Sequence, residues 1–192
     1  MSEERDPEIQ RVIDRAAIEE CLLRYTRGID RHDVELVTSA FHPDALDTHG
    51  TFEGGPRDVA EWANEQHGLR WVSHQHYITN TSVDLDGDVA HTDTYYFIVL
   101  RRNDGTGQDI MGGRYVDRFE RRAGDWRIAR RVVTADWIGE IPAGRDTMQS
   151  RLGLYIEPRW DRDDISYQRP LTDASMRTTT DDDFQQSTAT TS

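Results

Sequence analysis

The sequence predicts an α+β fold in which helices come first and an antiparallel sheet follows. Apolar residues recur at helical three- and four-residue intervals through the first third of the chain. From Trp71 the pattern changes to long runs of aromatic and β-branched residues, separated by Asp-Gly and Asn-Asp-Gly turns. Helices that precede the strands, rather than alternating with them, are typical of α+β proteins.

Three helices are predicted, over about residues 7–29, 34–41 and 56–66, with a short strand over 45–49. Pro43 stops the second helix, because proline cannot continue one and restricts the residue before it. A turn at Gly54-Gly55 leads to Pro56, which suits the first position of a helix, and Gly68 ends that helix. The first helix is long and amphipathic, so it is the natural cover for one face of a sheet.

Four long strands are predicted over about residues 71–85, 89–101, 110–121 and 126–137. Short turns join them, which indicates an antiparallel meander. Gly112-Gly113 precedes no helix, so it predicts a bulge or a bend of a barrel rather than a phosphate-binding loop.

The C-terminal quarter carries weaker signals. We predict one domain over residues 1–141, an arm over 142–171 that packs on the domain or on a neighbouring subunit, and a disordered tail over 172–192. A short helix is expected near 145–155, and the tail is rich in Thr, Ser, Asp and Gln with little to bury.

Composition excludes several classes of function. The net charge is −13, from 23 basic and 36 acidic residues, which disfavours nucleic acid and anionic membranes as partners. Every basic residue is arginine, so mechanisms that need a lysine amine or a Walker-type lysine are excluded. Cys21 is the single cysteine, and the first ten residues are charged and polar, so we expect a cytoplasmic protein without an internal disulfide.

Two histidines of the first long strand are candidate general bases. His74 and His76 lie two residues apart and therefore on one face of the strand. They could also chelate a metal with a third ligand such as His91 or Asp93, but no spacing supplies that ligand, so we expect neither metal nor cofactor. The structural alternative is one buried, hydrogen-bonded histidine and one exposed histidine.

Asp30 ends the first helix, where the helix dipole disfavours a carboxylate. One interpretation is that it pairs with a histidine, fixing the tautomer and raising the basicity of the ring. The alternative is a surface aspartate near His32 and Asp33. Tyr25 lies five residues earlier and can share a cavity with Asp30 only if the helix ends irregularly.

Three strand residues are weaker candidates for the functional site. Arg114 and Arg131 lie within strands, where an inward arginine needs a carboxylate or an anionic ligand. An ion pair at the edge of the sheet explains them equally well. Tyr96 lies in an aromatic run that favours core packing, and we include it with His74 and Arg114 as candidate substrate contacts.

The order of elements carries a family resemblance over about residues 6–141. RAAIEECLLRYTRGIDRHDVELVTSAFHPDA in the helical part, SHQHYITN in the first long strand and RYVDRFERRAGDWRIARRVV in the last two resemble the SnoaL-like group of the nuclear transport factor 2-like superfamily. The branch with scytalone dehydratase, hexachlorocyclohexane dehydrochlorinase and bile acid 7α-dehydratase is most similar. This resemblance implies a cone-shaped barrel, with a strongly curved, mainly antiparallel sheet wrapped on three N-terminal helices around a pocket.

The resemblance also implies roles for single residues. The acid of the family's Asp-His dyad falls on Asp30 and the histidine on His76. Tyr25 matches a tyrosine of the bile acid enzyme, and Arg131 an arginine of the dehydrochlorinase. Ile98 stands where the bile acid enzyme has a second aspartate, and Tyr25 where the dehydrochlorinase has lysine, so the substrate stays open.

Together these observations predict a cofactor-independent lyase that uses the dyad to remove a proton and expels water or halide from a hydrophobic cyclic small molecule. An isomerase or cyclase acting on a steroid- or polyketide-like substrate is one alternative, and a non-catalytic ligand-binding domain is another. The resemblance further implies a homo-oligomer, with a trimer favoured over a dimer, formed through the open sheet face that includes Trp126 and Trp137.

Overall fold

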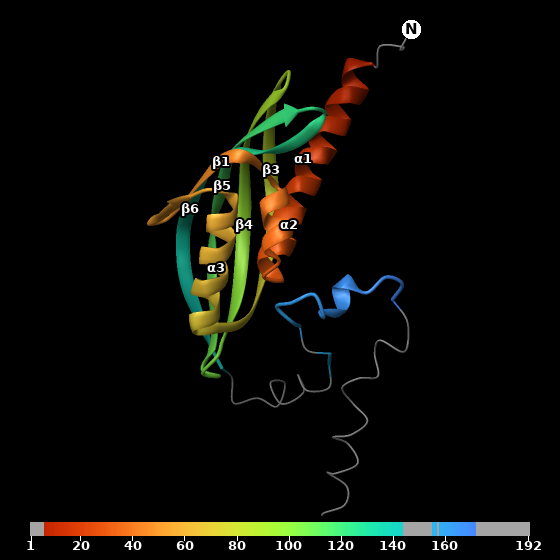
Figure 1. The fold of residues 1–192 in the computed structure, drawn as a ribbon. Coiled ribbons are helices and arrows are strands. Elements are labelled where there is room, and N and C mark those ends of the chain that lie inside the picture. Colours follow the sequence, from red (N-terminus) through yellow and green to blue (C-terminus); the bar gives the residue numbers. More distant parts are fainter. Residues whose placement is uncertain (1–5, 144–154, 157, 172–192) are drawn as a thin grey trace, which may run out of the picture.

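A computed structural model of the chain describes residues 6–143, 155–156 and 158–171 (Figure 1). Three helices, α1 (Pro7–Asp30), α2 (Val34–Ser39) and α3 (Pro56–Arg70), cover one face of a curved six-stranded sheet. The strands are β1 (Phe41–His49), β2 (Phe52–Gly54), β3 (Trp71–Asp86), β4 (Val89–Arg102), β5 (Gly107–Arg122) and β6 (Asp125–Pro142). They follow the order β2-β1-β6-β5-β4-β3, and every pair is antiparallel except β1 with β6. The predicted α+β cone is confirmed.

Irregularities in the strand pairing accompany the curvature of the sheet. The register shifts between Ile78 and Thr81 of β3, and at Gly112-Gly113 of β5, where the extra residue is Asp136 of the facing strand β6. The glycine pair thus lies at an irregularity of the pairing, as predicted, but the extra residue belongs to β6. A Cβ on Gly112 would lie 2.4 Å from the ring of Trp137, so no larger residue fits beneath that ring.

Several element boundaries differ from the predictions. The strand predicted at 45–49 begins at Phe41, because the chain joins β6 directly after α2 and Phe41 pairs with Ile128. Residues 52–54, expected to lead into a turn, form β2 against β1. Helix α3 passes through Gly68 to Arg70, and β6 reaches Pro142 because β5 pairs with it along its whole length.

The core lies between α1 and the inner face of the sheet. Helix α1 buries Ile18, Leu22, Tyr25 and Ile29 there. Gly28 allows α2 to cross closely, since a Cβ at that position would lie 2.7 Å from the backbone nitrogen of Val37.

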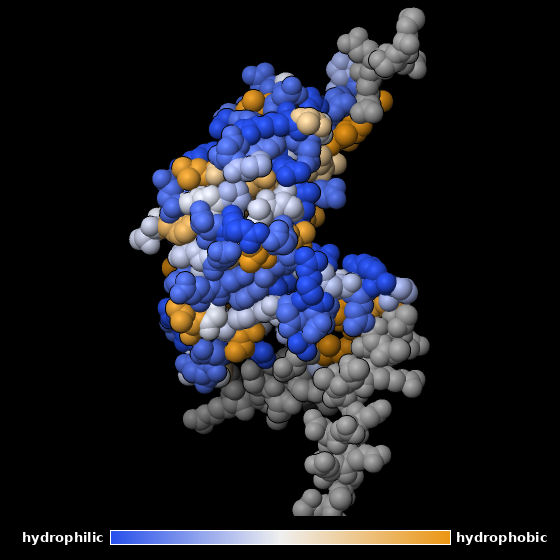
Figure 2. Space-filling model, in the orientation of Figure 1, coloured by the Kyte–Doolittle hydropathy of each residue, from blue (hydrophilic) through white to orange (hydrophobic). Residues whose placement is uncertain are grey.

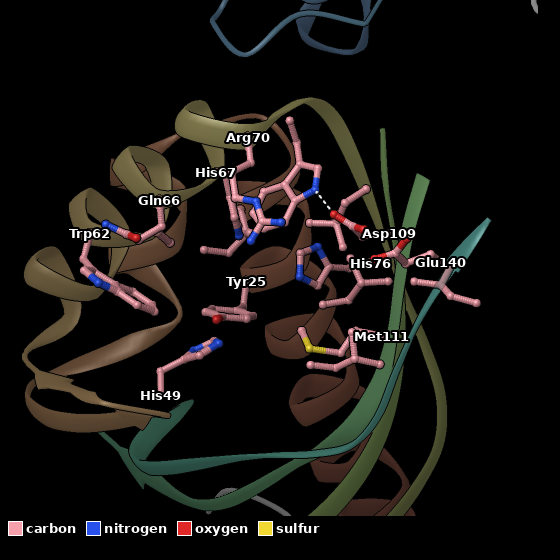
Figure 3. A pocket seen from close by; sticks show the side chains of 17 residues that line it. Tyr25, His49, Trp62, Gln66, His67, Arg70, His76, Asp109, Met111 and Glu140 are labelled. Carbon is pink, nitrogen blue, oxygen red and sulfur yellow. Dashed lines mark hydrogen bonds between the residues drawn. The ribbon is translucent and has the colours of Figure 1, made fainter. Parts of the chain in front are cut away.

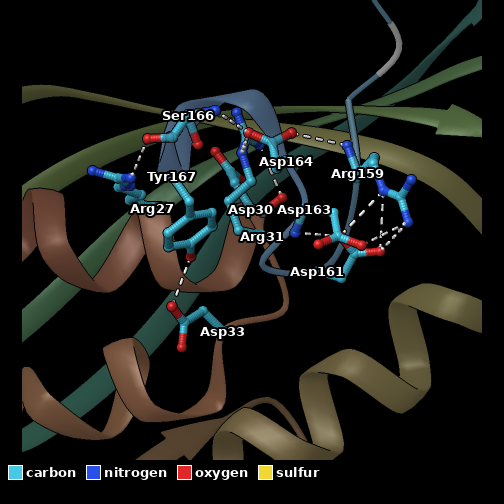
Figure 4. Close-up of polar contacts among 10 residues, drawn as sticks. All are labelled: Arg27, Asp30, Arg31, Asp33, Arg159, Asp161, Asp163, Asp164, Ser166 and Tyr167. Carbon is cyan, nitrogen blue, oxygen red and sulfur yellow. Dashed lines mark hydrogen bonds and ion pairs between the residues drawn. The ribbon is translucent and has the colours of Figure 1, made fainter. Parts of the chain in front are cut away.

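Part of the C-terminal arm lies on its own domain, at the junction of α1 and α2 (Figure 4). Its short 3₁₀ helix η2 (Ile165–Tyr167) places the Tyr167 hydroxyl 2.7 Å from Asp33, and Asp164 forms an ion pair with Arg31 at 3.1 Å. The predicted helix up to residue 154 and the predicted disordered tail lie outside the described residues.

The outer face of the sheet carries an aromatic row. Tyr77, Phe97 and Trp137 follow one another across β3, β4 and β6, with ring centroids 6.0 and 5.7 Å apart. Trp137 is 46% exposed, as expected for an open face. The expectation for Trp126 is wrong: it is buried on the inner side, where its indole N–H donates to Asp14.

The face seen in Figure 2 is mostly hydrophilic, with apolar residues in small separate patches. Within the part of the chain that the structure describes, no helix is long and apolar enough to cross a membrane.

Candidate active site

Asp30 and His76 form a close pair between the end of α1 and the middle of β3. Oδ1 of Asp30 lies 2.6 Å from Nδ1 of His76, and Oδ2 accepts a 3.0 Å hydrogen bond from the His76 backbone N–H. An ionised carboxylate can only accept, so Nδ1 carries the proton and Nε2 keeps its lone pair. The pair therefore holds an imidazole oriented as a general base.

His76 lines a cavity of about 280 Å³ between α1, α3 and the inner face of the sheet (Figure 3). Most of the wall is apolar and comes from Ile29, Trp62, Ala63, Trp71, Ile98, Leu100, Ile110, Met111 and Ile138. The polar lining residues are Tyr25, His49, Gln66, His67, Arg70, His76, Asp109 and Glu140. An apolar space with a few convergent polar groups is the usual form of a small-molecule site.

Tyr25 lies between His76 and His49 in this lining (Figure 3). Burial, with a smaller contribution from the charge of Asp47, raises the pKa of Tyr25 well above its usual value. The phenol therefore stays protonated at neutral pH and can donate a hydrogen bond into the cavity. Its ring packs against the guanidinium of Arg131, whose central carbon lies 4.2 Å from the ring centroid.

Of the residues predicted from the sequence, Asp30, His76 and Tyr25 come together, and four others do not line the cavity. His74 is 2% exposed and its Nε2 lies 2.9 Å from the backbone oxygen of Ile29. Arg131 is fully buried in a two-bond ion pair with Asp117, both bonds 2.7 Å long. The expectation that Arg131 touches substrate is therefore corrected, because Tyr25 separates it from the cavity.

Tyr96 and Arg114 are the other two. The Tyr96 hydroxyl donates to the backbone oxygen of Thr134, which makes it a core residue. Arg114 pairs with Asp93 at 3.2 Å and Asp136 at 3.6 Å, and both acids are partly exposed. Alternation along β5 buries Gly113, Tyr115 and Asp117 on the inner side, so Arg114, which lies between them, is on the outer face.

A second carboxylate and a second histidine near the cavity were not predicted from the sequence. His49 lines it, and Nδ1 of His49 lies 3.8 Å from Oδ1 of Asp47, a separation too long for a hydrogen bond. Burial lowers the pKa of His49 to about 4 and raises that of Asp47 to about 7. Strand alternation could have indicated this pair, because Asp47 and His49 are two residues apart in β1 and therefore face the same side.

Asp47 leads to a prediction about stability. It is 1% exposed, and neither carboxylate oxygen has a hydrogen-bond partner among the described residues. The folded chain binds a proton here below about pH 7, whereas the unfolded chain does so only below about 3.8. The folded state therefore loses stability as the pH rises from about 4 to 7, and above pH 7 the loss stays at its full value of about 4 kcal/mol.

We therefore expect Asp47→Asn to raise the free energy of unfolding at pH 8 and to have a much smaller effect at pH 4.5. Urea unfolding at several pH values measures the difference. Asp84→Asn, an exposed change in β3, is the matched control. A stability difference that is the same at both pH values contradicts the prediction.

Three more histidines meet beside the dyad. His32 follows α1, His67 lies near the end of α3, and His74 lies in β3. Their candidate ligand atoms lie within 4.8 Å of one another, as do those of Asp30, His74 and His76. Burial, reinforced by neighbouring histidines, lowers the pKa of His32 and His74 to about 4 and that of His67 to about 2, so all three rings are neutral at pH 7. His91 and Asp93, suggested as third ligands, are in neither group.

Comparison with known proteins places the chain in a family. Residues 10–132 match the SnoaL-like domain. The chain belongs to the SnoaL-like domain family. Uncharacterized protein Rv2910c of Mycobacterium tuberculosis is 28% identical over 130 residues, which cover 66% of this chain and 88% of that protein.

Solved structures share the fold of this SnoaL-like chain. A hexachlorocyclohexane dehydrochlorinase, LinA-type3 from Novosphingobium barchaimii, is 21% identical with a TM-score of 0.65, covering 79% of this chain and 99% of its own. A scytalone dehydratase-like protein from Novosphingobium aromaticivorans is 20% identical with a TM-score of 0.61, covering 71% and 97%. Rv3472 of Mycobacterium tuberculosis, a protein of unknown function, is 27% identical with a TM-score of 0.61, covering 68% and 76%.

Proposed function

We propose that this SnoaL-like protein is a lyase that eliminates water or a halide from a small hydrophobic ring compound. The observation that carries the proposal is the 2.6 Å contact between Asp30 and Nδ1 of His76, because it leaves Nε2 as a base at the wall of an apolar cavity. Family membership supports a related enzyme type, since dehydrochlorinase and dehydratase-like proteins share the fold.

In the proposed reaction, Nε2 of His76 takes a proton from a ring carbon of the substrate. The electrons of that C–H bond form a carbon–carbon double bond, and the bond from the neighbouring carbon to hydroxyl or halide breaks. Asp30 stabilises the resulting imidazolium, and the protonated phenol of Tyr25 donates a hydrogen bond to the departing group or to a developing enolate. A leaving hydroxyl takes up the proton that His76 has removed and departs as water, whereas a leaving halide departs as an anion and His76 releases its proton to solvent.

The size of the cavity narrows the substrate class. The cavity volume of about 280 Å³ is just below the range of roughly 300–1,000 Å³ that is typical of small-molecule sites. Apolar walls with few charges suit a neutral compound of one or two rings better than a four-ring steroid.

A product assay tests the proposal. Purified protein is incubated with cyclic β-hydroxyketones and with polychlorinated cyclohexanes, and products are analysed by mass spectrometry. We expect loss of the mass of water or of hydrogen chloride from at least one compound. A product of unchanged mass would mean isomerisation or ring closure, and binding without conversion of any compound would indicate a ligand-binding domain; either outcome contradicts the lyase.

We also propose that the aromatic row of Tyr77, Phe97 and Trp137 is an interface between copies of the chain. Light scattering should give a mass above that of one chain, with a trimer as the expected state, and Trp137→Glu should shift it towards the monomer by placing a charge on the apolar surface. Arg127→Glu, which changes a half-exposed side chain near the start of β6, is the control. A monomeric wild-type protein refutes this proposal.

A further inference from the structure

A cluster of three histidines lies outside the proposed catalytic pair and has no role in the elimination. His32, His67 and His74 come from the α1–α2 junction, α3 and β3, so distant segments of the chain bring them together. Their ring centroids are 5.4 Å apart for His32 and His74, 4.4 Å for His67 and His74, and 6.0 Å for His32 and His67. Such a convergence of imidazoles from three elements needs a physical explanation.

One nitrogen of each ring is buried and unpartnered. His32 Nε2, His67 Nδ1 and His74 Nδ1 have no hydrogen-bond partner among the residues described here. A buried polar atom without a partner costs about 1–3 kcal/mol, so native proteins seldom leave three of them together. A shared ligand at the centre of the cluster would remove this cost.

We propose that His32, His67 and His74 bind a divalent transition-metal ion of the Zn²⁺ class. Three imidazoles without a carboxylate in the set suit Zn²⁺, Co²⁺, Ni²⁺ or Cu²⁺ rather than Ca²⁺ or Mg²⁺, which prefer oxygen ligands. The rings are in the neutral form that ligates metals. The proposal is independent of the lyase reaction, in which His76 is the base and no metal takes part.

The surroundings of His74 fit a metal ligand. Its Nε2 lies 2.9 Å from the backbone oxygen of Ile29, so this nitrogen donates and Nδ1 presents its lone pair to the cluster. Metal-bound histidines commonly donate their other N–H to a backbone carbonyl or carboxylate, and here Oδ1 of Asp30 also lies 3.7 Å from Nε2. This arrangement determines the tautomer that a metal requires.

The C-terminal arm covers the cluster. The indole of Trp160 stacks on His32 with ring centroids 3.9 Å apart and lies 5.2 Å from the ring of His74. His67 meanwhile lines the cavity, so the cluster lies between the arm and the cavity wall. Three histidine ligands leave the fourth position of a tetrahedral site free for water. Metal–nitrogen bonds of about 2.0–2.1 Å require the three ligand nitrogens, which lie within 4.8 Å of one another, to approach to separations of about 3.4 Å.

The test uses the full chain without an affinity tag, because a polyhistidine tag would bind metal itself. Chelator-treated protein is titrated with Zn²⁺, followed by calorimetry and by thermal unfolding, and with Co²⁺, followed by visible absorption. We expect one ion per chain, a higher Tm with Zn²⁺, and the absorption of four-coordinate Co²⁺. His32→Gln and His67→Gln should each weaken binding by at least about 100-fold.

Two control variants make the result decisive. His91→Gln changes an exposed histidine in β4 and should bind Zn²⁺ like the wild type. His76→Gln should also keep its ion; loss of binding there would place the metal at Asp30, His74 and His76 and overturn the proposal. If the wild type binds Zn²⁺ no more tightly than His67→Gln does, the proposal is also overturned. Ordered water would then be the partner of the three unpaired nitrogens. None of these readouts depends on lyase turnover, so failure of one proposal is separable from failure of the other.

Discussion

His76→Gln is expected to lower kcat of the elimination reaction by about 10²–10⁴-fold while leaving the fold intact. Glutamine retains much of the side-chain volume but cannot take a proton from carbon at neutral pH. Asp30→Asn should cause a loss of similar size. The amide would donate instead of accept, which favours the wrong tautomer of the ring 2.6 Å away. KM should change much less than kcat, since neither change alters the apolar walls.

Turnover assays on both variants, together with thermal unfolding and circular dichroism, check this result. His91→Gln and Asp84→Asn change the same residue types at exposed positions of β4 and β3, and should keep wild-type turnover. If His76→Gln and Asp30→Asn are folded and turn over within about 10-fold of the wild type, the pair is not the catalytic base and its orienting acid.

The fold was predictable where local patterns coincide with the final structure. Helix α1 and strands β3 to β6 follow from periodicity and turn residues, and the glycine pair in β5 indicated where its pairing with β6 is irregular. Strands β1 and β2 were partly missed because they are stabilised by pairing with β6 and with each other, which no local pattern encodes. Gly68 was misread as a helix end because nothing in the sequence shows that α3 continues directly into β3.

The candidate site was predictable only in part. The residues alone offered Asp30 with a histidine of the first long strand, the resemblance singled out His76, and the structure brings Asp30 and His76 into contact. His67 shares the inward stripe of α3 with Val59 and Ala63 at four-residue spacing, a signal that was present but unused. Arg114 was misplaced because strand alternation divides β5 into two sets of residues, and the sequence does not show which set faces the core.

Arg131 carries the second large prediction. Its guanidinium is fully buried, forms two 2.7 Å bonds with Asp117 and lies 4.2 Å from the ring centroids of both Tyr25 and Tyr115. Arg131→Met should lower the free energy of unfolding by about 3–5 kcal/mol, because it leaves the carboxylate of Asp117 buried without a counter-charge. Burial already raises the pKa of Asp117, and removal of the arginine raises it further.

The double variant Arg131→Met/Asp117→Leu separates the charge from the packing. It removes both buried charges, so it should be more stable than Arg131→Met alone, as urea unfolding would show. Arg130→Met is the control: this neighbour pairs with Glu53 at the surface, and its loss should cost no more than about 1 kcal/mol. A double variant no more stable than Arg131→Met would mean that contact with the tyrosine rings, not charge, is what the arginine supplies.

Turnover of the double variant tests whether Arg131 also contributes to the reaction. If the variant folds and keeps turnover, Arg131 only packs against the ring of Tyr25 and does not act on the substrate. If it folds and loses turnover while Tyr25 stays in place, the buried cation takes part in stabilising the leaving group through the phenol of Tyr25.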